Sequence, residues 1–358
     1  MRKATFIVRE DPALLNNQVF SGNALYGMKS DTYLYVALQQ ELRTRGFDLA
    51  TQDLNPVAES ELIISLDQVL PYRDVVARPG QRWFLILTEP PTYYPANYEA
   101  ANHTIFEKIF TWNYPRADNR RYFHYHFAID FDSYSPYQSV SEAEFKGRKL
   151  CTLAAAAFGV SPPPAGSPSL LYERYLTLKW FAEHHPDEFD LYSRGIDPKV
   201  YSSFRGARLV GRLLPGFITA ALVAKRRRVF ERVHRGSIPP DQKIEVLRRY
   251  RFYVCYENTG GMPGAISEKI FDCFAAAMVP IYLGDDDLHK LIPPGCFIDR
   301  RQFKTHEALY RFLKEMTYAE YSRYICAAED FLRSPACELF SVGHNVRLIT
   351  SGMLADVK

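Results

Sequence analysis

The stretch FYVCYENTGGMPGAISEKIFDCFAAAMVPIYLG, residues 252–284, decides the fold. Residues 252–256 and 279–283 are runs rich in aromatic and β-branched residues, as expected for buried strands of a parallel sheet. Between them, apolar residues recur at helical spacing, at Ile270, Phe271, Phe274 and Met278. This spacing predicts an amphipathic helix that begins near Ser267, so the stretch is predicted to be a βαβ unit.

The turn between the first strand and the helix, residues 257–264, carries three glycines and one proline. A turn at the carboxyl end of a strand in an open α/β sheet lines the crevice where ligands bind. The helix then presents its free N–H groups and positive dipole end to that crevice, and Lys269 adds a full charge. The pattern predicts a phosphate site, although glycine can also serve chain reversal alone.

Length and composition bound the domain count and the class of protein. The 358 residues are 47% hydrophobic, which predicts two domains of about 150 residues each. A net charge of +3 is too small to indicate nucleic-acid binding. The six cysteines form no C-x-x-C pair and several lie in apolar runs, which favours reduced, buried thiols. The first residues lack an apolar run typical of a signal peptide or anchor, so we expect a cytoplasmic location.

Residues 1–145 are predicted to form a Rossmann-like domain, because short apolar runs alternate with helical patterns. Strands are expected at residues 4–8, 62–66, 84–87 and 105–112. A helix with leucines 34, 38 and 42 on one face is expected to be capped by Asp31 and to stop at Gly46. Glu89 follows the strand at 84–87, so its carboxylate is expected to point into the cleft; a simply exposed glutamate is the alternative.

Residues 146–335 repeat the alternation and are predicted to be a second domain, followed by a helical tail at 336–358. Strands are expected at residues 150–156, 189–192, 252–256, 279–283 and 296–298. Helices are expected at residues 169–184 and 243–250. Arg174 lies in the first of these helices, and Arg194 follows the strand at 189–192 near the predicted crevice.

A basic insertion, residues 196–235, interrupts the second domain with a local balance of +8, so the rest of the chain is about −5. Its apolar part, residues 209–224, contains Arg212 and Pro215 and is too short to span a bilayer comfortably. An apolar run beside cations favours peripheral contact of residues 205–235 with an anionic membrane, at its inner face. A plain basic surface is the alternative, and no nucleic-acid module accompanies the charge.

The order of residues from Tyr256 onward carries a family resemblance. Tyr256-Glu257-Asn258-Thr259, a glycine turn, Ser267-Glu268-Lys269 and Val279-Pro280-Ile281-Tyr282-Leu283-Gly284 resemble the donor-binding signature of the bacterial-type α-1,3/4-fucosyltransferases, glycosyltransferase family 10. The resemblance extends over roughly residues 145–330. It implies an α/β, GT-B-like fold in which two Rossmann-like domains face each other across a cleft, with the acceptor domain first and the donor domain second.

The resemblance also implies an activity: inverting transfer of L-fucose from GDP-fucose to a hydroxyl of a glycan acceptor. The donor-binding residues that it implies are Arg174, Asn258, Glu268 and Lys269, with Arg194 and Lys243 as further candidates. Lys269 and Arg174 would offset the diphosphate charge as the leaving group departs. Glu89 resembles the base that deprotonates the acceptor hydroxyl.

No metal is expected to be obligatory, with Mg²⁺ or Mn²⁺ at most a stimulant. Residues 285–287 are three aspartates and invite a divalent-metal site, but a solvated loop is the expected explanation. Ala265 stands where the family has a tyrosine, so that Met262 or a nearby tyrosine would have to fill the space. Transfer from another nucleotide sugar, or a non-catalytic protein that binds nucleotides or glycans, are the alternatives.

Overall fold

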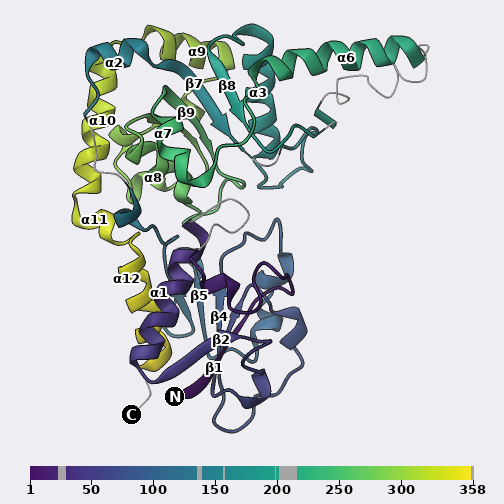
Figure 1. The fold of residues 1–358 in the computed structure, drawn as a ribbon, viewed down its shortest axis with the longest axis vertical. Coiled ribbons are helices and arrows are strands. Elements are labelled where there is room, and N and C mark those ends of the chain that lie inside the picture. Colours follow the sequence, from purple (N-terminus) through teal and green to yellow (C-terminus); the bar gives the residue numbers. More distant parts are fainter. Residues whose placement is uncertain (23–29, 135–138, 156–157, 198, 201–215, 356–358) are drawn as a thin grey trace.

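The computed structural model describes the chain except residues 23–29, 135–138, 156–157, 198, 201–215 and 356–358. Two α/β domains follow one another along the long axis of the molecule, and each is built on one parallel sheet (Figure 1). The predicted fold class, with two Rossmann-like domains, is therefore confirmed. The capping side chain predicted at Asp31 lies outside the described part.

The N-terminal sheet has the strand order β2-β1-β3-β4-β5-β6, and all five pairings are parallel. Its strands are β1 Arg2–Ile7, β2 Phe47–Thr51, β3 Leu62–Leu66, β4 Arg82–Leu87, β5 Lys108–Thr111 and β6 Tyr122–His124. The strand predicted at 105–112 is shorter than expected because its first residues form a turn, in which the Phe106 N–H donates to the His103 carbonyl at 3.1 Å.

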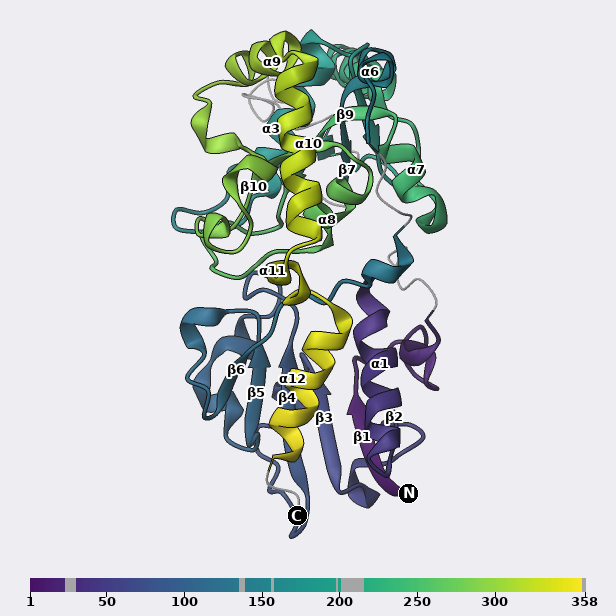
Figure 2. The same cartoon turned by 90° about the vertical axis from the view of Figure 1, so that its left-hand side faces the viewer.

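Two helices from opposite ends of the chain lie side by side on one face of this sheet (Figure 2). They are α1 Ser30–Thr44 and α12 Val342–Leu354. Leu38 and Leu42 of α1 are fully buried, as the helical spacing predicts, and Ile349 and Met353 of α12 are buried in the same core. The helix in the predicted tail at 336–358 therefore completes the core of the N-terminal domain.

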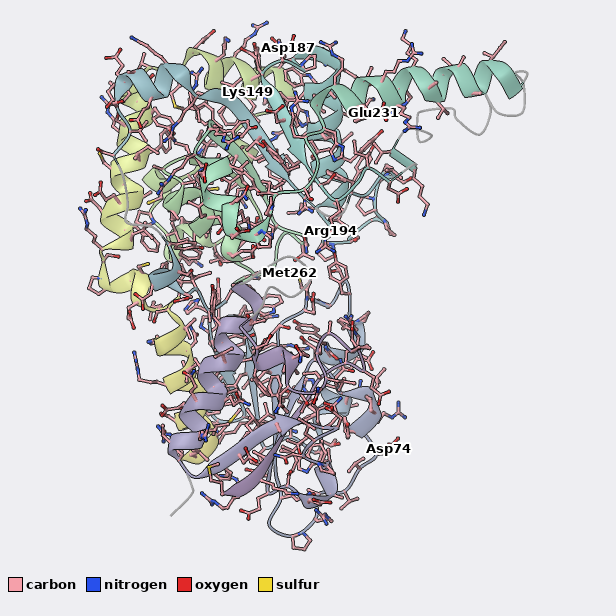
Figure 3. All side chains as sticks on the ribbon, viewed as in Figure 1. Asp74, Lys149, Asp187, Arg194, Glu231 and Met262 are labelled. Atoms are coloured by element: carbon pink, nitrogen blue, oxygen red, sulfur yellow. The ribbon has the colours of Figure 1, made fainter. Side chains whose placement is uncertain are left out.

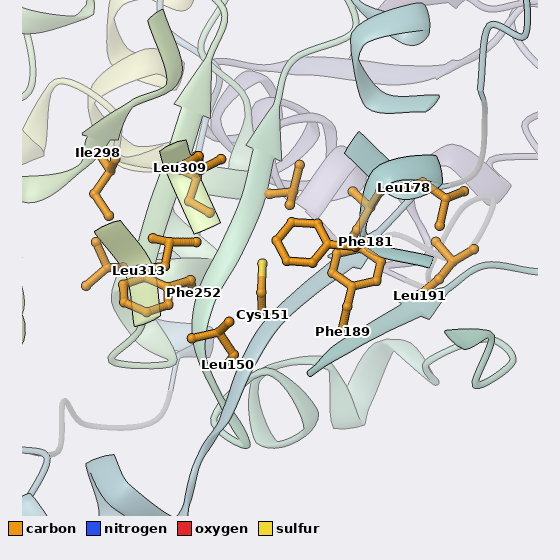
Figure 4. Close-up of a cluster of buried hydrophobic side chains, with 14 of the residues drawn as sticks. Leu150, Cys151, Leu178, Phe181, Phe189, Leu191, Phe252, Ile298, Leu309 and Leu313 are labelled. Carbon is orange, nitrogen blue, oxygen red and sulfur yellow. The ribbon is translucent and has the colours of Figure 1, made fainter. Parts of the chain in front are cut away.

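The C-terminal sheet has the strand order β11-β10-β9-β7-β8, again parallel throughout. Its strands are β7 Lys149–Ala154, β8 Phe189–Tyr192, β9 Tyr250–Tyr256, β10 Val279–Leu283 and β11 Ile298–Asp299. Its helices are α2 Glu142–Gly147, α3 Leu171–His184, α6 Gly216–Val233, α7 Lys243–Leu247, α8 Glu268–Ala275, α9 His306–Glu315, α10 Tyr318–Leu332 and α11 Pro335–Glu338. Aromatic and aliphatic side chains fill the core beside the sheet, including Phe181, Phe189 and Phe252 (Figure 4).

The predicted βαβ unit is present, with Phe252 of β9 paired with Val279 of β10. Its helix α8 ends at Ala275 instead of continuing to Met278 as predicted. The reason is local: Ala277 has a φ of +47°, and a left-handed residue after the last turn stops a helix. The short helix predicted at 243–250 also ends early, at Leu247, before the strand begins at Tyr250.

The chain crosses between the domains twice. The first crossing follows β6, and the second joins α10 to α12. The two segments are hydrogen-bonded to each other, because the Ile129 N–H donates to the Phe340 carbonyl at 2.7 Å and the Val342 N–H donates to the Ile129 carbonyl at 3.1 Å. The paired crossings hold the carboxyl edge of one sheet opposite that of the other.

All six cysteines are free thiols. Five of them are buried, as predicted for reduced thiols in apolar runs, and Cys326 is exposed. Burial raises the pKa of the Cys296 and Cys337 thiols to about 12, which leaves them protonated and inert at neutral pH.

Candidate active site

The loops at the carboxyl ends of the two sheets contact each other directly. The Tyr114 hydroxyl, from the loop after β5, donates to Asp287 Oδ2, from the loop after β10, at 2.7 Å. Gly264 of the glycine turn has a φ of +91°, and a Cβ at this position would overlap the Trp112 carbonyl oxygen of the other domain. Only glycine fits this close approach of two backbones.

The start of helix α8 is organised by Glu257, a buried carboxylate at the end of β9. Glu257 accepts hydrogen bonds from the Ser267 N–H at 2.9 Å and from Lys269 Nζ at 3.2 Å. Lys269 also donates to the Ser267 hydroxyl at 2.8 Å. Burial lowers the pKa of Lys269, but the charges of Glu257 and Glu268 outweigh it, so the pKa is raised overall. A fixed ammonium group thus stands at the positive end of a helix.

Arg174 and Asn258 lie together beside the same strand end. Arg174 is 3% exposed, and its Nη2 donates to Asn258 Oδ1 at 3.0 Å and to the Tyr256 carbonyl at 2.8 Å. The structure therefore brings these two predicted donor-site residues into contact. The sequence predicted that Arg174 contributes a positive charge to the donor site. In the structure, its guanidinium group also fixes the orientation of the Asn258 amide.

Glu268 and Lys243 form a second cluster with Asp272 on the buried side of α8. Lys243 Nζ pairs with Asp272 and lies 4.0 Å from Glu268 Oε1. Burial alone would raise the pKa of Glu268, but the charges of Lys269 and Lys243 lower it overall. Lys243 is therefore paired with Asp272 and Glu268, whereas Lys269 is hydrogen-bonded to Glu257 and to the Ser267 hydroxyl.

Arg194 and Met262 lie on the side of the C-terminal domain that faces the N-terminal domain (Figure 3). Arg194 is exposed and follows β8, as predicted. Met262 and Ala265 are both half-buried in the glycine turn, and the Ala265 N–H donates to the Met262 carbonyl at 3.1 Å. Met262 is thus adjacent to the position where a tyrosine is missing.

Glu89 lies across from these residues, on the loop after β4 of the N-terminal domain. Its side chain is exposed, yet the surrounding protein partly desolvates it and raises its pKa. The positive charges of Arg9 and Lys269 act in the opposite direction. Lys269 belongs to the other domain, so Glu89 and Lys269 lie on the two sheet edges that contact each other through Trp112 and Gly264.

The loop that carries Glu89 is bound on both sides by side chains. The Glu89 carbonyl accepts a hydrogen bond from the Tyr98 hydroxyl at 2.7 Å. Its N–H and the neighbouring Thr88 N–H face the carboxylate of Asp67, which is buried after β3. Burial raises the pKa of Asp67 to about 7, and the Glu89 charge adds to that rise against the hydrogen bonds from Thr88.

The expectation of a solvated loop at residues 285–287 is wrong for Asp285. This residue is fully buried, and it accepts hydrogen bonds from the Gly264 N–H and the Asp287 N–H, each at 2.8 Å. Asp286 pairs with Arg301. Asp285 thus holds the glycine turn through Gly264. Within the described residues, no group of three His, Cys, Asp or Glu side chains is arranged to hold a metal ion.

Three residues of the site were not assigned from the sequence. Glu257 lies inside the motif Tyr256-Glu257-Asn258-Thr259. Its position next to Asn258 in that motif could have marked it as a site residue. Arg9 lies two residues after the end of β1, at the same sheet edge as Glu89, and its Nη1 lies 3.5 Å from the Tyr94 hydroxyl. Asp67 follows a predicted strand but carried no distinguishing pattern, because its partners are about 20 to 30 residues away.

Two parallel-sheet α/β domains whose carboxyl edges face each other have the architecture of the two-domain GT-B class of glycosyltransferase folds. Solved structures support this assignment. The chain superposes on "Crystal Structure of alpha1,3-Fucosyltransferase" with a TM-score of 0.54 and 14% identity, covering 99% of this chain and 91% of that one. It also superposes on "Crystal structure of Anabaena Alr3699/HepE in complex with UDP and glucose" with a TM-score of 0.56 and 10% identity, covering 99% and 100%.

The sequence comparisons give a more specific match, which lies in the second domain. Residues 227–332 match the family described as "Glycosyltransferase family 10 (fucosyltransferase) C-term". Alpha-(1,3)-fucosyltransferase FucT of Helicobacter pylori is 35% identical over 72 residues, which are 20% of this chain and 15% of that protein. The 4-galactosyl-N-acetylglucosaminide 3-alpha-L-fucosyltransferase FUT6 of Homo sapiens is 32% identical over 100 residues, 27% of each chain. The alignments thus span less than a third of these relatives, and the family model confirms the resemblance over residues 227–332.

Proposed function

We propose that the protein is an inverting glycosyltransferase that transfers L-fucose from GDP-fucose to a hydroxyl of a glycan acceptor. The observation that carries the proposal is that the carboxyl edges of the two sheets face each other, with Glu89 after β4 and Lys269 at the start of α8, in a chain whose residues 227–332 match a fucosyltransferase family. The relatives are named as α-L-fucosyltransferases, and a structure of the same fold, with a TM-score of 0.51, is titled as containing GDP.

The proposed chemistry divides between the domains. Lys269 and the start of α8 would bind the diphosphate and stabilise the charge that develops on it as the glycosidic bond breaks. Glu89 would take the proton from the acceptor hydroxyl, which attacks the anomeric carbon from the face opposite the nucleotide. Asn258, held by Arg174, would contact the nucleotide sugar. Each role uses a group that belongs to this chain, and no step requires a metal ion.

A donor other than GDP-fucose is the second candidate, and two observations favour it. Ala265 replaces the tyrosine of the fucosyltransferase pattern, and one solved structure of this fold is titled as a complex with UDP and glucose. A non-catalytic protein that only binds nucleotides or glycans is the third candidate.

Thermal shift with a panel of nucleotides separates these candidates. We expect GDP and GDP-fucose to raise the melting temperature, since a ligand at 100 times its Kd stabilises the folded state by about 2.7 kcal/mol. UDP, UDP-glucose and adenosine diphosphate serve as matched controls. Stabilisation by the uridine compounds alone would transfer the proposal to another donor, and stabilisation by GDP-fucose without sugar transfer to any glycan acceptor would favour the non-catalytic candidate.

We also propose that helix α6, in the basic insertion, contacts an anionic membrane surface from the cytoplasmic side. The helix projects from the domain (Figure 1), and its outer part exposes Leu222 beside the cation Lys225. Its inner part is anchored by Phe230 and Val233, which are buried. Residues 205–215 of the predicted contact segment, 205–235, lie outside the described residues. Among the residues the structure describes, no helix is long and apolar enough to cross a bilayer.

Vesicle flotation tests this contact. The double variant Lys225→Glu and Arg228→Glu should lower partitioning onto vesicles of phosphatidylglycerol and phosphatidylcholine at least tenfold, because each cation near such a surface contributes about 1 kcal/mol. The variant Arg120→Glu with Lys304→Glu changes the charge equally at exposed sites elsewhere and should float like the unmodified protein. Equal flotation of both variants would contradict the proposal.

A further inference from the structure

Asp67 is a buried carboxylate to which the proposed mechanism gives no role. It directly follows β3, and only 7% of its surface is exposed. Its φ of +54° lies in the left-handed region, which residues other than glycine seldom adopt. A backbone conformation of this kind persists where the surrounding contacts fix it, and such positions cluster at functional sites.

The contacts of Asp67 converge on the loop that carries Glu89. The Thr88 N–H donates to Asp67 Oδ1 at 3.0 Å, and the Thr88 hydroxyl donates to Oδ2. The Glu89 N–H lies 3.3 Å from Oδ2, and the side-chain amide of Asn97 donates to Oδ1 at 3.2 Å. Since Tyr98 holds the Glu89 carbonyl from the other side, both polar groups of the Glu89 backbone are fixed by side chains.

We infer that Asp67 is the positioning residue for Glu89, and that its hydrogen bonds set where the Glu89 carboxylate stands relative to the donor domain. The inference rests on the proposed function, in which Glu89 is the general base. A base contributes only from the correct place, and a displacement of about 1 Å at a reacting group costs on the order of 100-fold in rate. Asp67 does not touch the substrate in this arrangement; it acts through Glu89.

Asp67 positions Glu89 through its hydrogen bonds more than through its negative charge. A protonated Asp67 could donate to the Thr88 hydroxyl oxygen from Oδ2 while Oδ1 still accepted from the Thr88 N–H and from Asn97. An asparagine has the same shape, and with its amide group facing the Thr88 hydroxyl its Oδ1 still accepts from the Thr88 N–H and from Asn97. Its amide nitrogen cannot accept from the Glu89 N–H, which is left with Oδ1 at 3.4 Å. Asp67→Asn therefore preserves most of the contacts, whereas Asp67→Ala removes all of them.

The experiment measures kcat, the KM for GDP-fucose, GDP binding and the melting temperature in Asp67→Ala and Asp67→Asn, each with and without Glu89→Gln. We expect Asp67→Ala to lower kcat about 10- to 100-fold with unchanged GDP binding. Asp67→Asn should stay within about threefold of the unmodified protein. In the Glu89→Gln background, Asp67→Ala should cause no further loss, because a residue that acts only through Glu89 has nothing left to position.

An unchanged kcat in Asp67→Ala would overturn the inference while leaving the proposed function standing. A loss as large in the Glu89→Gln background as in the unmodified protein would also overturn it, since Asp67 would then act on the fold in general. If Asp67→Ala does not fold, Thr88→Val replaces it, because this change removes the hydroxyl that donates to Asp67 Oδ2; a several-fold loss of kcat is expected only when Glu89 is present. Full turnover in the single variant Glu89→Gln would show that Glu89 is not the general base, and this inference would fall with that role.

Discussion

Glu89→Gln should lower kcat for fucosyl transfer by about 10²- to 10⁴-fold, which is the usual contribution of a positioned general base. The substitution keeps the size of the side chain and removes its capacity to accept a proton. GDP should bind unchanged, because the groups expected to hold it lie in the other domain. Single-turnover kinetics and calorimetric GDP titration measure the two effects separately.

The pH dependence gives an independent signature of the same residue. A base must be deprotonated, so activity should rise with pH through the pKa of Glu89. Desolvation raises this pKa above the ordinary glutamate value. The acid limb should therefore lie above pH 4.5 in the unmodified protein and disappear from the residual activity of Glu89→Gln.

Glu99→Gln is the matched control, since Glu99 is an exposed carboxylate ten residues further along the same domain. It should keep its activity and its acid limb. A Glu89→Gln variant that turns over at the unmodified rate would remove Glu89 from the mechanism and point to another proton acceptor.

Lys269→Ala is expected to weaken GDP binding by at least tenfold and to lower transfer by about 10²- to 10³-fold, as removal of one group that stabilises developing charge commonly does. The ammonium group is held by Glu257 at 3.2 Å and by Ser267 at 2.8 Å, so its place at the helix start is well defined. GDP titration and steady-state kinetics measure both quantities.

Lys269→Ala also leaves Glu257 buried without its cation, which by itself costs stability of about 3–5 kcal/mol. The double variant Glu257→Gln with Lys269→Ala separates the two effects, because it removes the unpaired charge. We expect it to recover part of the lost stability without recovering GDP affinity. Lys304→Ala, at an exposed cation elsewhere on the domain, should change neither. Unchanged GDP binding in a folded Lys269→Ala would contradict the phosphate role.

The parts of the fold that could be predicted from the sequence are those in which local pattern and tertiary position agree. In residues 252–284 the helical spacing of apolar residues, the glycine turn and the strand-like runs all predict the same βαβ unit. Glu89 and Lys269 were predicted from position, because strand ends in a parallel sheet meet at one edge, whereas Asn258 was predicted from the family resemblance. The family resemblance then supplied the chemical roles that position alone does not define.

What could not be predicted depends on contacts between segments far apart in the chain. Three aspartates after a strand predict a solvated loop at Asp285. In the structure Asp285 is buried, and it accepts a hydrogen bond from the Gly264 N–H. Asp67 owes its position to Thr88 and Asn97 and to a backbone conformation that no sequence pattern marks. Nor does the apolar spacing of residues 342–354 tell which of two sheets that helix covers.

Helix α12 has a consequence for how the protein is made. The N-terminal sheet is synthesised first, but the apolar face over which Ile349 and Met353 pack remains open until residues 342–354 have left the ribosome. The donor domain, which lies between them in sequence, can complete its own core earlier. The first domain to be translated is thus the second to complete its fold. A nascent chain stopped before residue 342 would expose an apolar surface that chaperones can bind.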